Sequence, residues 1–173
     1  MIPMKWIALS FGLCLSLSSA SATPADDLVK QGEAALAAKD VAGALKAFDA
    51  ALDADPKNAR AAYDRGRINL VLHKNTNAVA DFTTAILAEP TMGVAYSARA
   101  EAKIIMKDEK SGFEDLDAGV KASPKNPEVY IMRATYRMRK GDVAGTKSDL
   151  QMARTVADGD MAKMLDVMLS KMQ

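Results

Sequence analysis

The sequence predicts an all-α solenoid, a fold in which short helices stack side by side along one direction. The main reason is a repeat: segment 44–56, with an apolar stripe at helical spacing and a proline at its end, returns 34 residues later as segment 78–90. Composition agrees, because alanine is abundant and aromatic residues make up only 5% of the chain. A sheet protein would contain more β-branched and aromatic residues.

The first 22 residues differ in kind from the rest of the chain. Lys5 is their only charge, an apolar run follows from Trp6 to Leu17, and small residues fill positions 18–22. A basic start, a short apolar segment and an Ala-x-Ala ending are typical of a secretory signal peptide, so we expect cleavage after Ala22. An uncleaved anchor is the alternative, although the apolar run is short for a helix that spans a bilayer.

Cleavage would leave a mature chain without cysteine, because Cys14 is the only one in the sequence. That chain could form no disulfide and bind no metal through sulfur. We therefore expect an exported protein, periplasmic or secreted, with no stable membrane insertion after cleavage. The balance of 23 basic and 22 acidic residues disfavours nucleic acid as a partner.

Four helix-turn-helix repeats are expected between residues 23 and 158, at 25–58, 59–92, 93–126 and 127–158. In the first repeat we expect a helix over 26–38, a turn with Asp40 as N-cap, and a second helix that ends before Pro56, since a residue before proline avoids the α region. Asn58 is placed to cap the next helix.

The second repeat should contain a helix over 59–74 and take its turn and cap from residues 75–77. In the third, Gly112 and Gly119 fall inside the second helix, where glycine is costly, and this predicts a close approach between helices. The alternative is that the third repeat is the loosest part of the solenoid. The fourth begins at Pro127, a favoured first helical residue, and turns at Gly141.

Segment 159–173 is expected to form a capping helix, because a solenoid needs a cap at its end. Its apolar residues are predicted to share one face: Met161, Met164, Leu165, Met168 and Met172. Helical spacing alone accounts for these methionines, which favours the cap over two alternatives, self-association and copper(I) binding.

The repeat resembles the tetratricopeptide repeat (TPR) family between Ala25 and Asp158. Position 1 of the repeat falls at Ala25, Ala59, Gly93 and Pro127. Position 8 is then small in every repeat: Gly32, Gly66, Ala100 and Ala134. Position 4 is large except in the second repeat: Leu28, Ala62, Tyr96 and Tyr130. The resemblance implies a right-handed superhelix that binds proteins.

The resemblance also implies that side chains from the first helix of each repeat line a concave groove. The residues that we expect to bind a peptide are Arg60, Tyr63, Arg67, Val94, Ser97, Glu101, Ile131 and Thr135. Three of them, Arg60, Tyr63 and Arg67, share one helix face and predict an anchor for an extended peptide with an acidic side chain near its centre. The clamp for a C-terminal carboxylate found in some TPR co-chaperones is not expected, because the matching places hold Val29, Glu33, Asp64, Val94 and Ala98.

Two repeat positions vary together. Position 7 reads Gln31, Arg65, Arg99 and Arg133, and position 23 reads Ala47, Asp81, Asp115 and Asp149. Arginine and aspartate thus appear in the same three repeats, and we interpret them as two-pronged structural ion pairs between the two helices of a repeat. A row of arginines that faces an anionic ligand is the alternative.

The sequence predicts no catalytic residues, no cofactor and no metal. His73 is the only histidine, and there is no glycine-rich phosphate loop or nucleophile elbow. The expected function is an exported, non-catalytic protein–protein interaction module with a protein or peptide partner. One alternative is a self-assembling or envelope-structure protein that uses the methionine-rich helix, and another is an enzyme.

Overall fold

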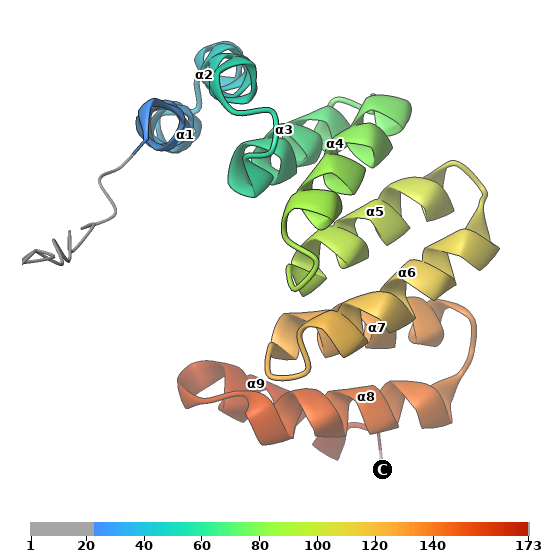
Figure 1. Ribbon diagram of the computed structural model, residues 1–173. Helices are drawn as coiled ribbons and strands as arrows, with labels where there is room; N and C mark the ends of the chain where they lie inside the picture. The colour runs from blue at the N-terminus through green and yellow to red at the C-terminus, as the bar shows by residue number, and fades with distance from the viewer. Residues whose placement is uncertain (1–22, 173) are drawn as a thin grey trace, which may run out of the picture.

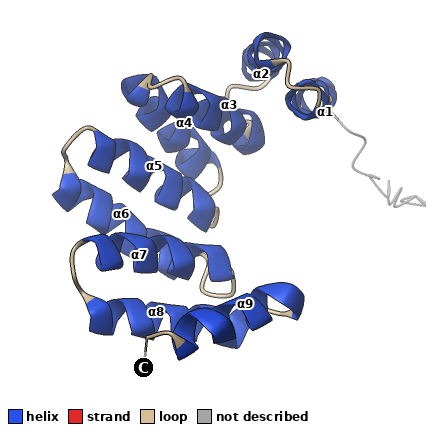
Figure 2. Ribbon diagram, turned by 180° about the vertical axis from the view of Figure 1, so that it is seen from behind, coloured by secondary structure: helices blue, strands red, loops and turns tan. Residues whose placement is uncertain are grey.

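The computed structural model describes residues 23–172, so the signal peptide predicted for residues 1–22 lies outside the described range. Within that range all regular structure is helical, in four hairpins followed by one helix (Figures 1 and 2). The hairpins are α1 (Pro24–Ala37) with α2 (Val41–Ala54), α3 (Ala59–Val71) with α4 (Asn75–Ala88), α5 (Gly93–Ile105) with α6 (Glu109–Ala122), and α7 (Pro127–Arg139) with α8 (Val143–Val156). The last helix is α9 (Gly159–Ser170). This architecture confirms the predicted all-α helical repeat fold.

All four hairpin turns have the same geometry. The second residue after the first helix is left-handed, with φ of 62° at Lys39, 58° at His73, 72° at Lys107 and 77° at Gly141. The next N–H then bonds back to a carbonyl in the last turn of that helix; Asp40 N to Ala35 O, at 2.8 Å, is one example. This is the Schellman arrangement, and it ends each first helix at the same repeat position.

The start of α4 corrects the sequence prediction. Asp40, Asp108 and Asp142 each cap the second helix of their hairpin, but Lys74 occupies the equivalent place before α4 and makes no side-chain cap. Asn75 is already the first helical residue, and its Oδ1 is buried without a hydrogen-bond partner. The predicted cap from residues 75–77 is therefore wrong, because the turn ends one residue earlier.

The two helices of a hairpin pack a large side chain against a small one. A Cβ atom on Gly32 would lie 2.5 Å from Phe48 Cε1, and one on Gly66 would lie 2.7 Å from Phe82 Cε1. In the later hairpins, where leucine takes the place of phenylalanine, alanine takes the place of glycine: Ala100 with Leu116, and Ala134 with Leu150. The contact volume is thus kept nearly constant along the superhelix.

The glycines of α6 confirm the predicted close approach. A Cβ on Gly119 would lie 2.9 Å from the carbonyl oxygen of Gly93 on α5, and one on Gly112 would lie 2.5 Å from Ile104 Cγ1. Ser123, just beyond α6, accepts a hydrogen bond from the Gly93 N–H at 2.9 Å. Backbone therefore touches backbone in this hairpin, and a larger side chain would separate the helices.

Helix α9 packs on α8 but does not bury all its methionines. Leu165 is fully buried among Val129, Leu150 and Ala153, while Met161 and Met172 pack at the edge of that cluster. Met164 and Met168 are 49% and 39% exposed, so the rest of the fold covers only part of the apolar face predicted for α9. In residues 23–172, no helix has the length and apolar character needed to cross a membrane.

Candidate functional site

A groove of about 560 Å³ crosses α3, α5 and α7, the first helices of three consecutive hairpins. It brings together six of the eight predicted peptide-binding residues: Tyr63, Arg67, Val94, Ser97, Glu101 and Ile131. Arg60 does not line it, and Thr135 lines an adjoining pocket between α7, α8 and α9 instead. Helix α5 contacts both α3 and α7, and side chains at equivalent repeat positions of these first helices therefore share one surface.

Much of the apolar lining was missed in the sequence. Leu70, Val71 and Ile105 belong to it, although Val71 is 77% exposed and Ile105 is 45% exposed. They occupy repeat positions 12 and 13, which the TPR resemblance also places on the concave face, so extending the same register would have found them. The remaining lining residues outside the predicted set are His73, Ala98, Glu128 and Met132.

Tyr63 and Arg67 form the best-defined feature of the groove. The Tyr63 ring packs against Phe82, with centroids 5.9 Å apart, and the Arg67 guanidinium carbon lies 5.8 Å from the Tyr63 ring centroid. Burial raises the pKa of the Tyr63 hydroxyl, so the tyrosine stays neutral at physiological pH. The Arg67 side chain is 61% exposed, and Asp64, at 3.9 Å, is a distant partner, which leaves its donors accessible to a ligand.

Arg60 differs from the prediction because its charge is already used. Its Nη2 lies 2.8 Å from Glu33 Oε1 on α1, and its Nε lies 2.6 Å from Asp64 Oδ2 on its own helix. Asp64 is only 2% exposed, and burial raises the pKa of its carboxyl while Arg60 and Arg67 oppose the rise. Arg60 thus joins α1 to α3, and its charge is matched by two carboxylates in the absence of a ligand.

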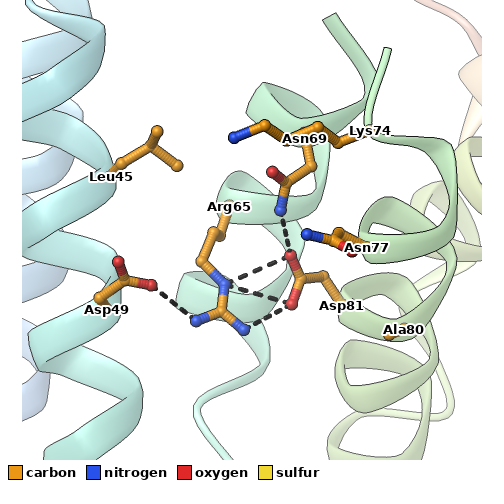
Figure 3. Close-up of a pocket in the computed structure, with 8 residues that line it drawn as sticks. All are labelled: Leu45, Asp49, Arg65, Asn69, Lys74, Asn77, Ala80 and Asp81. Carbon is orange, nitrogen blue, oxygen red and sulfur yellow. Dashed lines mark hydrogen bonds and ion pairs between the residues drawn. The ribbon is translucent and has the colours of Figure 1, made fainter. Parts of the chain in front are cut away.

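The predicted arginines and aspartates lie within hydrogen-bond distance in all three repeats. Arg65 donates to both oxygens of Asp81, the shortest contact being 2.6 Å (Figure 3). Arg99 reaches Asp115 at 2.7 and 2.8 Å, and Arg133 reaches Asp149 at 2.6 and 3.0 Å. The aspartates are at most 6% exposed, so each charge is matched inside the fold.

Each of these arginines also reaches back to the preceding hairpin. The partners are Asp49 for Arg65 at 2.7 Å, Thr83 for Arg99 at 3.0 Å and Asp117 for Arg133 at 2.8 Å. We call Arg65, Arg99 and Arg133 with these partners the arginine ladder. A polar pocket of about 410 Å³ surrounds its first step, where Asn69 also donates to Asp81 (Figure 3). The ladder lies apart from the groove, because none of its arginines lines it.

Titratable groups do not gather into a metal site in the part of the chain that the structure describes. No group of three or more histidine, cysteine, aspartate or glutamate side chains is placed to hold an ion among residues 23–172. His73 lies at the α3–α4 turn and at one end of the groove. The groove offers a ligand apolar contact, the Arg67 cation beside Tyr63 and the carboxylates of Glu101 and Glu128.

Comparison with known proteins agrees with this geometry. Residues 29–95 match the family model described as tetratricopeptide repeat. A STIP1 homolog protein from Dictyostelium discoideum is 36% identical over 78 residues, which is 45% of this chain and 14% of that protein. The chain therefore spans a small part of the relative that it matches.

Two solved structures share the fold over most of the described helices. A thermophilic TPR protein from Thermus thermophilus superposes with a TM-score of 0.69 at 18% identity, covering 86% of this chain and 80% of the other. The first TPR domain of Spaghetti (RPAP3), bound to the HSP90 peptide SRMEEVD, superposes with a TM-score of 0.62 at 20% identity, covering 70% of this chain and 96% of the other.

The fold makes this chain an all-α helical repeat protein. Within that class, residues 29–95 match the tetratricopeptide repeat model, and the structural neighbours share the fold.

Proposed function

We propose that this chain is an exported, non-catalytic interaction module that binds a peptide or protein partner in the groove across α3, α5 and α7. The observation that carries the proposal is the groove itself, an apolar surface with a few placed polar groups, which is the usual form of a binding site. A neighbour of the same fold has been solved with a peptide bound, which supports a peptide as the kind of ligand.

The anchor of this site is the Tyr63–Arg67 pair. The Arg67 guanidinium lies over the Tyr63 ring, and this contact restricts the arginine, so it loses less freedom when it binds a carboxylate. Tyrosine and arginine are also the side chains on which binding energy concentrates at interfaces. We therefore expect the partner to place an acidic side chain against Arg67 and an apolar one against Leu70 and Val71.

A photo-crosslinking residue at position 71 tests the location of the site. Val71 and Leu87 are almost equally exposed, at 77% and 78%, but only Val71 lines the groove. In the native compartment, a partner should be captured from position 71 and not from position 87. Equal capture from both positions would place the contact outside the groove.

Two substitutions test the anchor on the captured complex. Tyr63→Ala and Arg67→Glu should each weaken it by about 1–3 kcal/mol. Lys46→Glu, at an exposed site on α2 away from the groove, is the matched control. Unchanged binding by both groove variants, with helix content intact by circular dichroism, would contradict the proposal.

Export is proposed from the sequence of residues 1–22 and has its own test. Mass spectrometry of the protein from its native cells should give a chain that begins at Thr23. A full-length mass in the cytoplasm would contradict it.

Self-assembly through α9 is the second candidate function. It is favoured by the exposed apolar side chains of Met164, Val167 and Met168, of which Val167 is 55% exposed. If α9 mediates self-assembly, sedimentation experiments should show an oligomer whose share rises with protein concentration. The substitution Val167→Glu should dissociate that oligomer into monomers.

A further inference from the structure

The groove continues beyond α7. A second section of about 390 Å³ lies between α7, α8 and α9, and Ile131 lines both sections. Its walls carry Met138, Met168 and Met172, and its floor includes the buried Leu150. Met138 and Met168, which are 45% and 39% exposed, thus line a surface that adjoins the groove of Tyr63 and Arg67 at Ile131.

The two sections differ in charge. Glu101 and Glu128 line the first section together with Arg67, whereas the charged residues that line the second are Arg139 and Lys171. The Arg139 guanidinium carbon lies 4.9 Å from the Tyr136 ring centroid, which is the stacked arrangement seen at Arg67. Within residues 23–172, neither Arg139 nor Lys171 has a carboxylate within 4.0 Å. The second section therefore offers two cations beside an apolar surface.

We propose that this second section binds an apolar side chain of the partner peptide together with an adjacent carboxylate. Methionine side chains are flexible and polarisable, so the walls can adjust to leucine, isoleucine or phenylalanine. Arg139 and Lys171 donate to the carboxylate, and the stacking on Tyr136 holds the arginine ready. The inference rests on the proposed function and adds the chemical class of its ligand: an apolar residue next to an acidic one or to a C-terminal carboxylate.

Methionine ε-methyl NMR of the full chain tests this assignment directly. The probe is a short serine- and glycine-rich synthetic peptide that carries Leu-Leu-Glu and is amidated at its end. It should shift the methyl signals of Met138, Met168 and Met172 and leave that of Met152, exposed on α8 outside the groove, unchanged. A second peptide that ends in Leu-Leu with a free carboxylate distinguishes a terminal from a side-chain source.

Substitutions in the protein and in the peptide test the apolar contact and the carboxylate contact separately. Arg139→Glu and Lys171→Glu should each weaken the peptide about tenfold. Lys163→Glu reverses a charge on α9 outside the second section and should not change the affinity for the peptide. Peptides with serine in place of leucine, or lysine in place of glutamate, should lose the methyl shifts.

Three outcomes would overturn the inference, and they bear differently on the proposed function. The peptide could shift only the methyl signal of Met132 and lose binding in Arg67→Glu but not in Arg139→Glu. That result would support peptide binding in the first section and exclude it from the second. Shifts of Met138 and Met168 on dilution of the protein alone would show that a second copy covers this surface. Peptides that move no methyl signal in either section would contradict the groove as a whole.

Discussion

The guanidinium group of Arg65 contacts Asp49 of the preceding hairpin, with Nη1 and Oδ1 2.7 Å apart, while its other edge holds both oxygens of Asp81. One side chain therefore fixes the packing inside its own repeat and the packing against the repeat before it. Arg133 does the same with Asp149 and Asp117. The position of each hairpin along the superhelix depends in part on these contacts.

Arg65→Gln should destabilise the fold by about 3 kcal/mol, because it leaves the buried Asp81 carboxylate with the Asn69 amide alone. The double variant Arg65→Gln/Asp81→Ala recreates the Gln31 and Ala47 combination of the first repeat and should recover most of the loss. Urea unfolding of both variants measures the difference. A double variant as unstable as the single one would show that the buried charge is not the cause.

Gly66→Ala should cost about 1–3 kcal/mol, since the new Cβ would lie 2.7 Å from Phe82 Cε1. Adding Phe82→Leu should restore part of that stability, because alanine faces leucine in the third and fourth repeats. Thermal unfolding of the two single variants and the double variant gives the coupling between the sites. Additive losses would mean that the ring and the glycine do not constrain each other.

The hairpin turns provide a matched pair of backbone tests. Gly141→Ala should destabilise by about 1 kcal/mol, because φ there is 77° and no atom lies within 4 Å of the new Cβ, so only the backbone conformation is strained. Lys107→Gly, at φ of 72°, should raise the melting temperature for the same reason. A fall in melting temperature for Lys107→Gly would mean that the lysine side chain makes a contact that outweighs the strain.

Asp64→Asn should stabilise the protein at neutral pH. Burial raises the pKa of Asp64 above its ordinary value of 3.8, so the carboxyl binds its proton more tightly in the folded state than in the unfolded state. The free energy of unfolding therefore falls as the pH rises from about 3.8 through the raised pKa. The advantage of asparagine should therefore be complete above that pKa and vanish as the pH falls below about 3.8. Urea unfolding at several pH values measures it, with Asp160→Asn, at a fully solvated carboxylate, as the control. An advantage that does not change with pH would contradict the mechanism.

The repeat period was enough to predict the hairpins, because a helix and its turn are determined by residues close in sequence. The pairs of Arg65 with Asp81 and of Arg99 with Asp115 could be inferred because arginine and aspartate appear in the same repeats. The contact of Arg65 with Asp49 could not, since it joins two hairpins, and threonine at position 83 hides the pattern. Contacts between repeats depend on how the hairpins pack, which the period does not specify.

The groove shows the same limit. Tyr63 and Arg67 were found from their repeat positions, but the availability of Arg60 depended on Glu33 of another helix. For α9, the loop after α8 is two residues, Ala157 and Asp158, whereas four residues join α6 to α7. The exposure of Met164 and Met168 depends on how α9 packs on α8, which the spacing of the methionines does not specify.

At the middle step of the arginine ladder, Arg99 contacts the preceding hairpin through the neutral hydroxyl of Thr83. At the outer steps the corresponding partners are the charged Asp49 and Asp117, whose side chains are 58% and 55% exposed. Dissolved ions screen exposed charge pairs and have little effect on a hydroxyl hydrogen bond. Rising ionic strength should therefore loosen the first and last hairpins before it affects the block from α3 to α6. At high salinity the two terminal hairpins would then separate more easily from the central hairpins, while the central hairpins would keep their packing.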